Sequence, residues 1–363
     1  MKKLTILTVL VFCLSQLFAQ SGGIQLENIN RFHQKLSEKL TDNEPGTAII
    51  ITQGDDIIYD AYFGLANVEN EEKLHAGHVM GIASMSKQFT GMAVLCLAQD
   101  GKLNLDDDIS EHLSGLPLGE RKITIRRLLS HTSGLPELTQ NDEFMNQIDK
   151  AHSVAQIIDV GLNGKFRSEP GERYIYCNTA YTLAVALIEK LSGMNYADFM
   201  KERVFIPLQM NDTYAADFEH DALTAVPRYV ADSTGYKRAI TMHFSNLIGG
   251  GGIISNVQDM AKWNMALVSG KNLPANYRLL WEPVLLNSGE STNYGLGMGI
   301  SEINGETFYY HPGMGSGMNS INLIFPERKM TITVIRNISA PSVSSKDIAL
   351  MAVDYLIDGK QVE

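Results

Sequence analysis

The sequence has few cysteines and lacks long apolar runs beyond its N-terminal end. Three cysteines occur among 363 residues, and Cys13 lies in that N-terminal apolar stretch. We expect Cys96 and Cys177 to be buried free thiols, because a chain of this length forms a large core without covalent cross-links. After residue 19, no segment reaches the roughly 18 apolar residues that a membrane-spanning helix needs. The sequence therefore predicts no membrane span in the mature protein.

The chain also lacks an excess of positive charge, since its formal net charge is -11 at pH 7. A basic surface is the usual electrostatic footprint of a protein that binds nucleic acid or anionic membranes, so neither is an expected partner. The four glycines at 249–252 precede no Gly-Lys-Ser/Thr pattern, which argues against a phosphate-binding loop. No third ligand is evident near His75 and His78. No metal or organic cofactor is therefore expected.

The first residues are typical of a secretory signal peptide. Two lysines at positions 2 and 3 precede an apolar stretch over 4–18, and the small residue Ala19 follows. We expect residues 1–19 to be removed and the mature protein to be exported, either to the periplasm or to the medium.

The hydrophobic pattern predicts strands near both ends of the chain and helices between them. The fold class expected is α+β: one antiparallel sheet, flanked by N- and C-terminal helices, with an inserted, mostly helical lobe. Residues 20–101 and 245–363 would form the α/β lobe, and residues 102–244 the helical lobe. The expected helices cover 25–40, 89–98, 154–160, 178–191, 196–204, 257–268 and 344–357, and the expected strands 47–52, 57–63, 295–303, 308–311, 321–325 and 330–336.

Ser84 and Lys87 are the first candidate catalytic pair. Ser84 precedes the apolar run 89–98 and is expected at the N-terminal end of a buried helix. Residues three apart share a helix face, so the Lys87 amine should lie beside the Ser84 hydroxyl. Burial and the positive end of the helix dipole disfavour a charged amine, so Lys87 could accept the hydroxyl proton. A weak nucleophile would thereby gain its base. The alternative is a capped helix with one exposed lysine.

Two further clusters contain groups suited to acyl transfer. Tyr176 could relay a proton, and Asn178, two residues on, can donate and accept hydrogen bonds. His311 would supply a polar or positive group at the end of the strand 308–311. Gly313 would let a substrate lie against the strand backbone, and the Met314 N–H could bind a developing oxyanion together with the Ser84 N–H. In isolation this last segment is equally consistent with a glycine-rich turn.

In this order, S-x-x-K, Y-x-N and H-x-G resemble the class C-like branch of the serine β-lactamase and penicillin-binding-protein superfamily. Segments 123–135 and 294–298 are similar to the same branch. The resemblance covers the chain from about residue 25 onward. It implies the two-lobed fold described above. Neither Ser84 nor Ser316 lies in a G-x-S-x-G pattern, which argues against an α/β-hydrolase.

The resemblance also implies roles for individual residues. Ser84 would be the acylated nucleophile, with Lys87 and Tyr176 sharing the general-base and general-acid steps. Asn178 and His311 would bind substrate, together with Gly313, and the backbone of Ser84 and Met314 would form the oxyanion hole.

His311 stands where many relatives have lysine, and a histidine charged only in part near neutral pH should bind a substrate carboxylate less strongly. The function expected is an exported serine hydrolase that acts on a small-molecule or peptide substrate, as a peptidase, amidase or β-lactamase-like enzyme. An esterase and a non-catalytic sensor of peptides or β-lactams are the alternatives. The oligomeric state and the role of Cys177 are left open.

Overall fold

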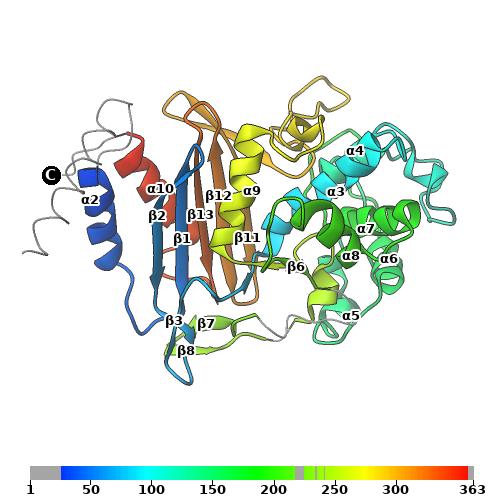
Figure 1. Cartoon of the computed structure of the whole chain (residues 1–363). Helices are drawn as coiled ribbons and strands as arrows, with labels where there is room; N and C mark the ends of the chain where they lie inside the picture. The colour runs from blue at the N-terminus through cyan, green and yellow to red at the C-terminus, as the bar shows by residue number, and fades with distance from the viewer. Residues whose placement is uncertain (1–25, 217–224, 234, 241, 359–363) are drawn as a thin grey trace, which may run out of the picture.

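The computed structural model describes residues 26–216, 225–233, 235–240 and 242–358, so the expected signal peptide lies outside the described residues. A six-stranded antiparallel sheet, in the order β10-β11-β12-β13-β1-β2, forms one half of the molecule (Figure 1). Strand β1 lies between β2 and β13, so the two ends of the chain form one sheet, as the sequence predicted. The strands are β1 (Thr47–Gln53), β2 (Asp56–Phe63), β10 (Gly299–Ile303), β11 (Glu306–Gly315), β12 (Met318–Phe325) and β13 (Met330–Arg336).

Helices cover both faces of the sheet (Figure 1). Strand β13 is buried along its whole length, and its alternate side chains enter two different cores, as the two-residue period of a strand requires. Ile332 packs in the core beneath the helices of the chain ends, whereas Thr333 bonds to Asn264 on the opposite face. The helices on the sheet are α2 (Leu26–Ser37), α10 (Ser345–Leu356) and α9 (Val257–Ser269).

The second half of the molecule is largely helical, and α9 lies between this half and the sheet (Figure 1). Helix α3 is buried from Lys87 to Leu97 and packs against α7 in the same core as α9. The sequence predicted this helix because of its unbroken apolar run. Helix α3 (Lys87–Gln99) thus borders both halves. The other helices here are α4 (Ile125–Leu129), α5 (Asp142–Met145), α6 (Val154–Leu162), α7 (Asn178–Ser192) and α8 (Tyr196–Met200), the last followed by a π-helical turn at Lys201–Phe205.

Short strands connect the two halves. Strand β6 pairs with β9, and β7 pairs with β14, so segments within residues 214–238 form small sheets that the sequence analysis did not predict. Strands of two to four residues carry too few alternating positions for a periodic signal. These strands are β3 (Leu65–Asn67), β4 (Glu72–Lys73), β5 (Met80–Gly81), β6 (Tyr214–Ala215), β7 (Tyr229–Asp232), β8 (Gly235–Arg238), β9 (Ile253–Ser255) and β14 (Ile338–Ser339).

Two expectations for the last strands are wrong in their extent. The strand expected over 295–303 begins only at Gly299, because the Gly295 N–H bonds to the Met298 carbonyl and closes a tight loop. The strand expected over 308–311 continues through Gly315 and pairs with β12 throughout. The glycines at 313 and 315 therefore belong to a strand and not to a glycine-rich turn, and this places β11 against the segment that carries Ser84.

Candidate active site

Ser84 lies in a short 3-10 turn, η1 (Ala83–Ser86), that runs directly into α3. Ala83 has a φ of 47°, a left-handed conformation that costs a non-glycine residue of order 1–3 kcal/mol. Surrounding bonds hold the turn in place. The Ser86 hydroxyl donates to the Ala83 carbonyl at 2.7 Å and accepts from the Ile253 N–H at 3.0 Å. The turn is therefore anchored to strand β9, and the half-buried Ser84 side chain faces a cavity.

The Lys87 amine lies beside Ser84 and is fully buried. Its Nζ is 3.5 Å from the Ser84 Oγ, and it also donates to the Asn178 Oδ1 at 2.9 Å and to the Gly250 carbonyl at 2.7 Å. Burial lowers the pKa of Lys87 to about 7, although the nearby Glu137 carboxylate opposes this shift. The amine is thus neutral in a large fraction of molecules at neutral pH and is able to take a proton.

Tyr176 completes a cluster of three groups around the Ser84 hydroxyl. Its phenol interacts with the Ser84 side chain, and burial raises the pKa of Tyr176 well above the ordinary value. The Lys87 Nζ lies 4.7 Å from the centroid of the Tyr176 ring. Tyr176 therefore remains a neutral phenol at neutral pH, so it can donate a proton or pass one on.

His131 holds the backbone that carries Tyr176 and Asn178. Its Nδ1 accepts the Cys177 N–H at 3.0 Å, its carbonyl accepts the Ile175 N–H at 2.8 Å, and its ring stacks on Tyr176 with centroids 4.2 Å apart. Burial is the main reason that the pKa of His131 lies well below its usual value. His131 is therefore a neutral structural histidine.

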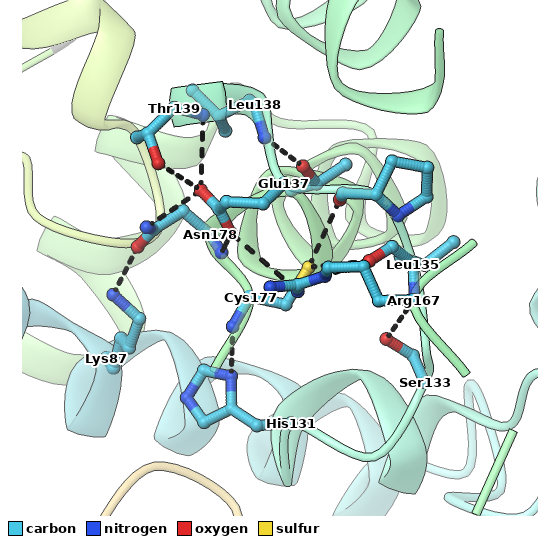
Figure 2. A network of polar contacts seen from close by, with 12 residues as sticks. Lys87, His131, Ser133, Leu135, Glu137, Leu138, Thr139, Arg167, Cys177 and Asn178 are labelled. Carbon is cyan, nitrogen blue, oxygen red and sulfur yellow. Dashed lines mark hydrogen bonds and ion pairs between the residues drawn. The ribbon is translucent and has the colours of Figure 1, made fainter. Parts of the chain in front are cut away.

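Asn178 is oriented by a glutamate that the sequence analysis missed (Figure 2). The Glu137 carboxylate accepts the Asn178 backbone N–H at 2.7 Å through Oε2 and the Asn178 side-chain amide at 3.0 Å through Oε1. It also accepts both the N–H and the hydroxyl of Thr139. Because the Asn178 amide donates to Glu137, its oxygen is turned toward Lys87. The glutamate thus acts on the amine through one intervening side chain.

Cys177 points away from the cavity, toward the core under α7. Its Sγ lies 3.4 Å from the Pro136 carbonyl, and its side chain packs with Ala180 and Leu183. Cys96 and Cys177 are both buried and free, as expected.

His311 and Gly313 occupy positions different from those expected. The His311 Nδ1 lies 2.7 Å from the Pro312 carbonyl, which can only accept, so Nδ1 carries the proton and Nε2 accepts from the Tyr294 hydroxyl at 2.9 Å. Burial, with a smaller contribution from Lys87, lowers the pKa of His311 to about 3. The expected partial positive charge is therefore wrong. Gly313 is buried, and a Cβ there would lie 2.3 Å from the Ile82 carbonyl, so this glycine admits the segment preceding Ser84.

A cavity of about 160 Å³ opens beside Ser84, between η1, α7 and β11. Ser84, Asn178 and Met314 line it, together with Gly250 and Gly251. The run of four glycines allows close backbone packing near the site, because a Cβ on Gly250 would lie 3.3 Å from the Lys87 Nζ. In the described ranges, no cluster of three or more His, Cys, Asp or Glu could hold a metal ion, and no helix is long and apolar enough to cross a membrane.

The fold and this arrangement place the chain in the β-lactamase family, whose family model, described as Beta-lactamase, matches residues 32–355. The chain belongs to this family and is a β-lactamase-related serine hydrolase. Among its relatives, penicillin-binding protein 4* of Bacillus subtilis (strain 168) is 29% identical over 357 residues, which cover 92% of this chain and 76% of that protein.

Solved structures give the same assignment. The octameric penicillin-binding protein homologue from Pyrococcus abyssi superposes with a TM-score of 0.79 at 27% identity, over 92% of this chain and 78% of that one. D-amino acid amidase from Ochrobactrum anthropi SV3 superposes with a TM-score of 0.77 at 22% identity, over 92% of this chain and 98% of that one. The second likeness concerns the fold.

Proposed function

We propose that the protein is an exported acyl-transfer hydrolase that forms an acyl-enzyme at Ser84 and releases it to water. One observation carries the proposal: a fully buried lysine, with its pKa lowered to about 7, holds its amine 3.5 Å from the Ser84 hydroxyl. A serine hydroxyl is a weak nucleophile until an adjacent base removes its proton. Lys87 is that base, and the Tyr176 phenol interacts with the same hydroxyl.

The reaction proceeds in two steps, acylation of Ser84 and hydrolysis of the acyl-enzyme. Neutral Lys87 takes the Ser84 proton as Oγ forms a bond to the substrate carbonyl carbon, and the backbone N–H groups of Ser84 and Met314 stabilise the oxyanion. Tyr176 passes the proton to the departing amine or alcohol when the scissile bond breaks. A water molecule then loses its proton to the same pair of groups and attacks the ester carbon, which restores free Ser84 and releases the acid.

Asn178 binds the substrate beside Ser84 in this scheme. Its side chain lines the cavity, while its oxygen accepts from Lys87 and its amide donates to Glu137. The division into an α/β lobe of residues 20–101 and 245–363 and a helical lobe of 102–244 belongs to the same proposal, as does export through the signal peptide 1–19.

The substrate is an amide or an ester. The names of the relatives support an amide: penicillin-binding proteins and an amidase share this fold. An esterase would use the same catalytic groups, and a sensor would be acylated without turnover. Experiment therefore separates an amidase, an esterase and a sensor.

Intact-protein mass spectrometry tests the proposal directly. Wild type, Ser84→Ala and Ser288→Ala are mixed with a penicillin, a D-alanyl peptide, a D-amino-acid amide and an activated ester. Ser288 is an exposed serine that does not line the cavity, so its variant controls for the loss of a hydroxyl. We expect mass gain or turnover with wild type and Ser288→Ala only. Turnover by Ser84→Ala equal to wild type would contradict the mechanism, and a stable adduct without turnover would favour the sensor.

A further inference from the structure

The cavity beside Ser84 has no charged side chain among its lining residues, within the described part of the chain. Its walls are formed mainly by apolar side chains from four segments of the chain. They are Leu138, Met242, Leu247, Ile248, Met314 and Met318. The polar side chains that line it are neutral hydroxyls and amides, among them Ser84 and Asn178. A substrate carboxylate placed here would lose hydration without gaining an ion pair, which is costly.

Two cationic side chains that contact residues of the cavity wall, Lys87 and Arg228, are engaged by other groups. The Lys87 ammonium has three N–H groups, and these are directed at Ser84, Asn178 and the Gly250 carbonyl. Arg228 contacts a lining residue through the Met242 carbonyl, but its guanidinium lies over the Phe244 ring at 4.6 Å and does not line the cavity.

His311 offers no charge and no free donor to a ligand. Its Nδ1–H donates to the Pro312 carbonyl, and its Nε2 accepts from the Tyr294 hydroxyl. The ring is buried and absent from the cavity wall. The position that the sequence analysis had assigned to a carboxylate-binding group is therefore occupied by a neutral ring with both nitrogens engaged.

The cavity volume limits the size of the group that it can enclose. An apolar protein cavity of about 150 Å³ accommodates a benzene molecule. The 160 Å³ beside Ser84 therefore accommodates a phenyl ring or a short alkyl chain, with its apolar walls in contact.

We propose that the preferred substrates are uncharged esters or amides that carry no carboxylate near the scissile bond and place an apolar group no larger than about a phenyl ring beside Ser84. This inference rests on the proposed acyl-enzyme function and specifies its substrate class. It separates this protein from enzymes that anchor a substrate through a carboxylate next to the bond they cleave.

Matched phenyl esters test the proposal in the full-length mature protein. The phenylacetate esters of 3-hydroxybenzamide and of 3-hydroxybenzoic acid differ only by the carboxylate on the leaving group. Each kcat/KM is divided by the rate constant for hydroxide-catalysed hydrolysis of the same ester, which removes the difference in leaving-group reactivity. We expect the amide-bearing ester to be preferred by at least tenfold, and phenylacetyl to be preferred over acetyl by about tenfold through apolar burial.

A charge placed at the cavity wall should reduce the discrimination. The Met314 side chain is 76% exposed and lines the cavity, so Met314→Lys adds an ammonium at a site that tolerates one, and Met314→Gln is the neutral control. Relative to the glutamine variant, the lysine variant should favour the carboxylate ester by about two- to fivefold, the size of an exposed ion pair. High salt should remove this gain, because it screens exposed charges.

The outcomes distinguish failure of the proposed substrate class from failure of the proposed acyl-enzyme function. Equal or faster hydrolysis of the carboxylate ester by wild type overturns the substrate class while leaving the acyl-enzyme intact, and so does equal use of acetyl and phenylacetyl esters. Identical discrimination by Met314→Lys and Met314→Gln overturns it as well. If neither these esters nor the penicillin, peptide and amide of the first panel give turnover or a mass gain that depends on Ser84, the proposed function itself fails.

Discussion

Replacing Glu137 with glutamine should impair catalysis although the residue does not line the cavity beside Ser84. Its carboxylate accepts two hydrogen bonds from Asn178 and two from Thr139. A glutamine has only one accepting oxygen. Its NH₂ group would therefore face N–H or O–H donors of Asn178 or Thr139 that the second carboxylate oxygen accepts in wild type. A hydrogen bond to a charged group contributes about 1.5–3 kcal/mol. If this loss falls on the positioning of Asn178 and Lys87, kcat/KM drops by about tenfold to hundredfold.

The same variant should change the pH dependence, with a sign fixed by the charge that is removed. The Glu137 carboxylate raises the pKa of Lys87, against the larger effect of burial. Glutamine removes this contribution, so the pKa of Lys87 falls and the base becomes neutral at lower pH. Because the two groups are separated by the Asn178 side chain, we expect a downward shift on the order of one pH unit, which corresponds to about 1.4 kcal/mol.

The assay is the pH profile of kcat/KM for an ester, measured with thermal unfolding of the same samples. Glu143→Gln is the matched control, because Glu143 is an exposed glutamate in α5. We expect the control to behave as wild type, and Glu137→Gln to be slower, with its acidic limb moved to lower pH. A Glu137→Gln enzyme with wild-type kcat/KM and an unmoved acidic limb would refute the reasoning, whatever its thermal stability.

Three further outcomes are expected. The kcat/KM of wild type should rise with pH through an apparent pKa near 7, because Lys87 must be neutral to act as base; a profile flat between pH 5 and 9 would contradict this. Tyr176→Phe should lower kcat by about 10²–10⁴ with unchanged circular dichroism, since the variant removes only the proton-transferring hydroxyl. Gly91→Ala should destabilise the protein by more than about 2 kcal/mol in urea unfolding, opposite to the usual effect in a helix, because the new Cβ would lie 1.9 Å from the Leu296 carbonyl.

The sequence predicted those parts of the fold that depend on local patterns. Helix α3 was predicted over 89–98 from its apolar run, and the structure extends it by a residue or two at each end. The pairing of β1 with β2 follows from two β-rich runs separated by a short polar turn. The loop at 294–298 was misread as strand, because Gly-Leu-Gly-Met alternates in hydrophobicity. Its glycines are instead required by close backbone packing, since a Cβ on Gly295 would lie 2.4 Å from the Leu280 carbonyl.

The candidate site could be predicted only where its residues are close in sequence. Ser84 and Lys87 are three residues apart on consecutive turns, so helix geometry alone predicted their contact. Glu137 lies 41 residues from Asn178, and Gly250 lies 163 residues from Lys87. Neither contact follows from spacing. The one available signal for Glu137 was its position as the single charged residue of the stretch 132–139, a setting in which a carboxylate that becomes buried needs partners.

The charge state of His311 also could not be predicted from spacing, because it depends on burial and on the nearby Lys87. This charge state affects both the pKa of Lys87 and the proposed substrate class. Burial lowers the pKa of His311, and the nearby Lys87 lowers it further, so the two groups compete for positive charge. A lysine at 311 would repel the ammonium form of Lys87 and would offer an anchor for a carboxylate. A neutral histidine removes both effects. The pKa of Lys87 is then set mainly by burial and by Glu137. A carboxylate beside Ser84 would raise that pKa, so a smaller fraction of the amine would be neutral and able to accept a proton at neutral pH. The absence of a charged side chain from the cavity wall, on which the proposed substrate class rests, therefore also keeps Lys87 able to accept a proton at neutral pH.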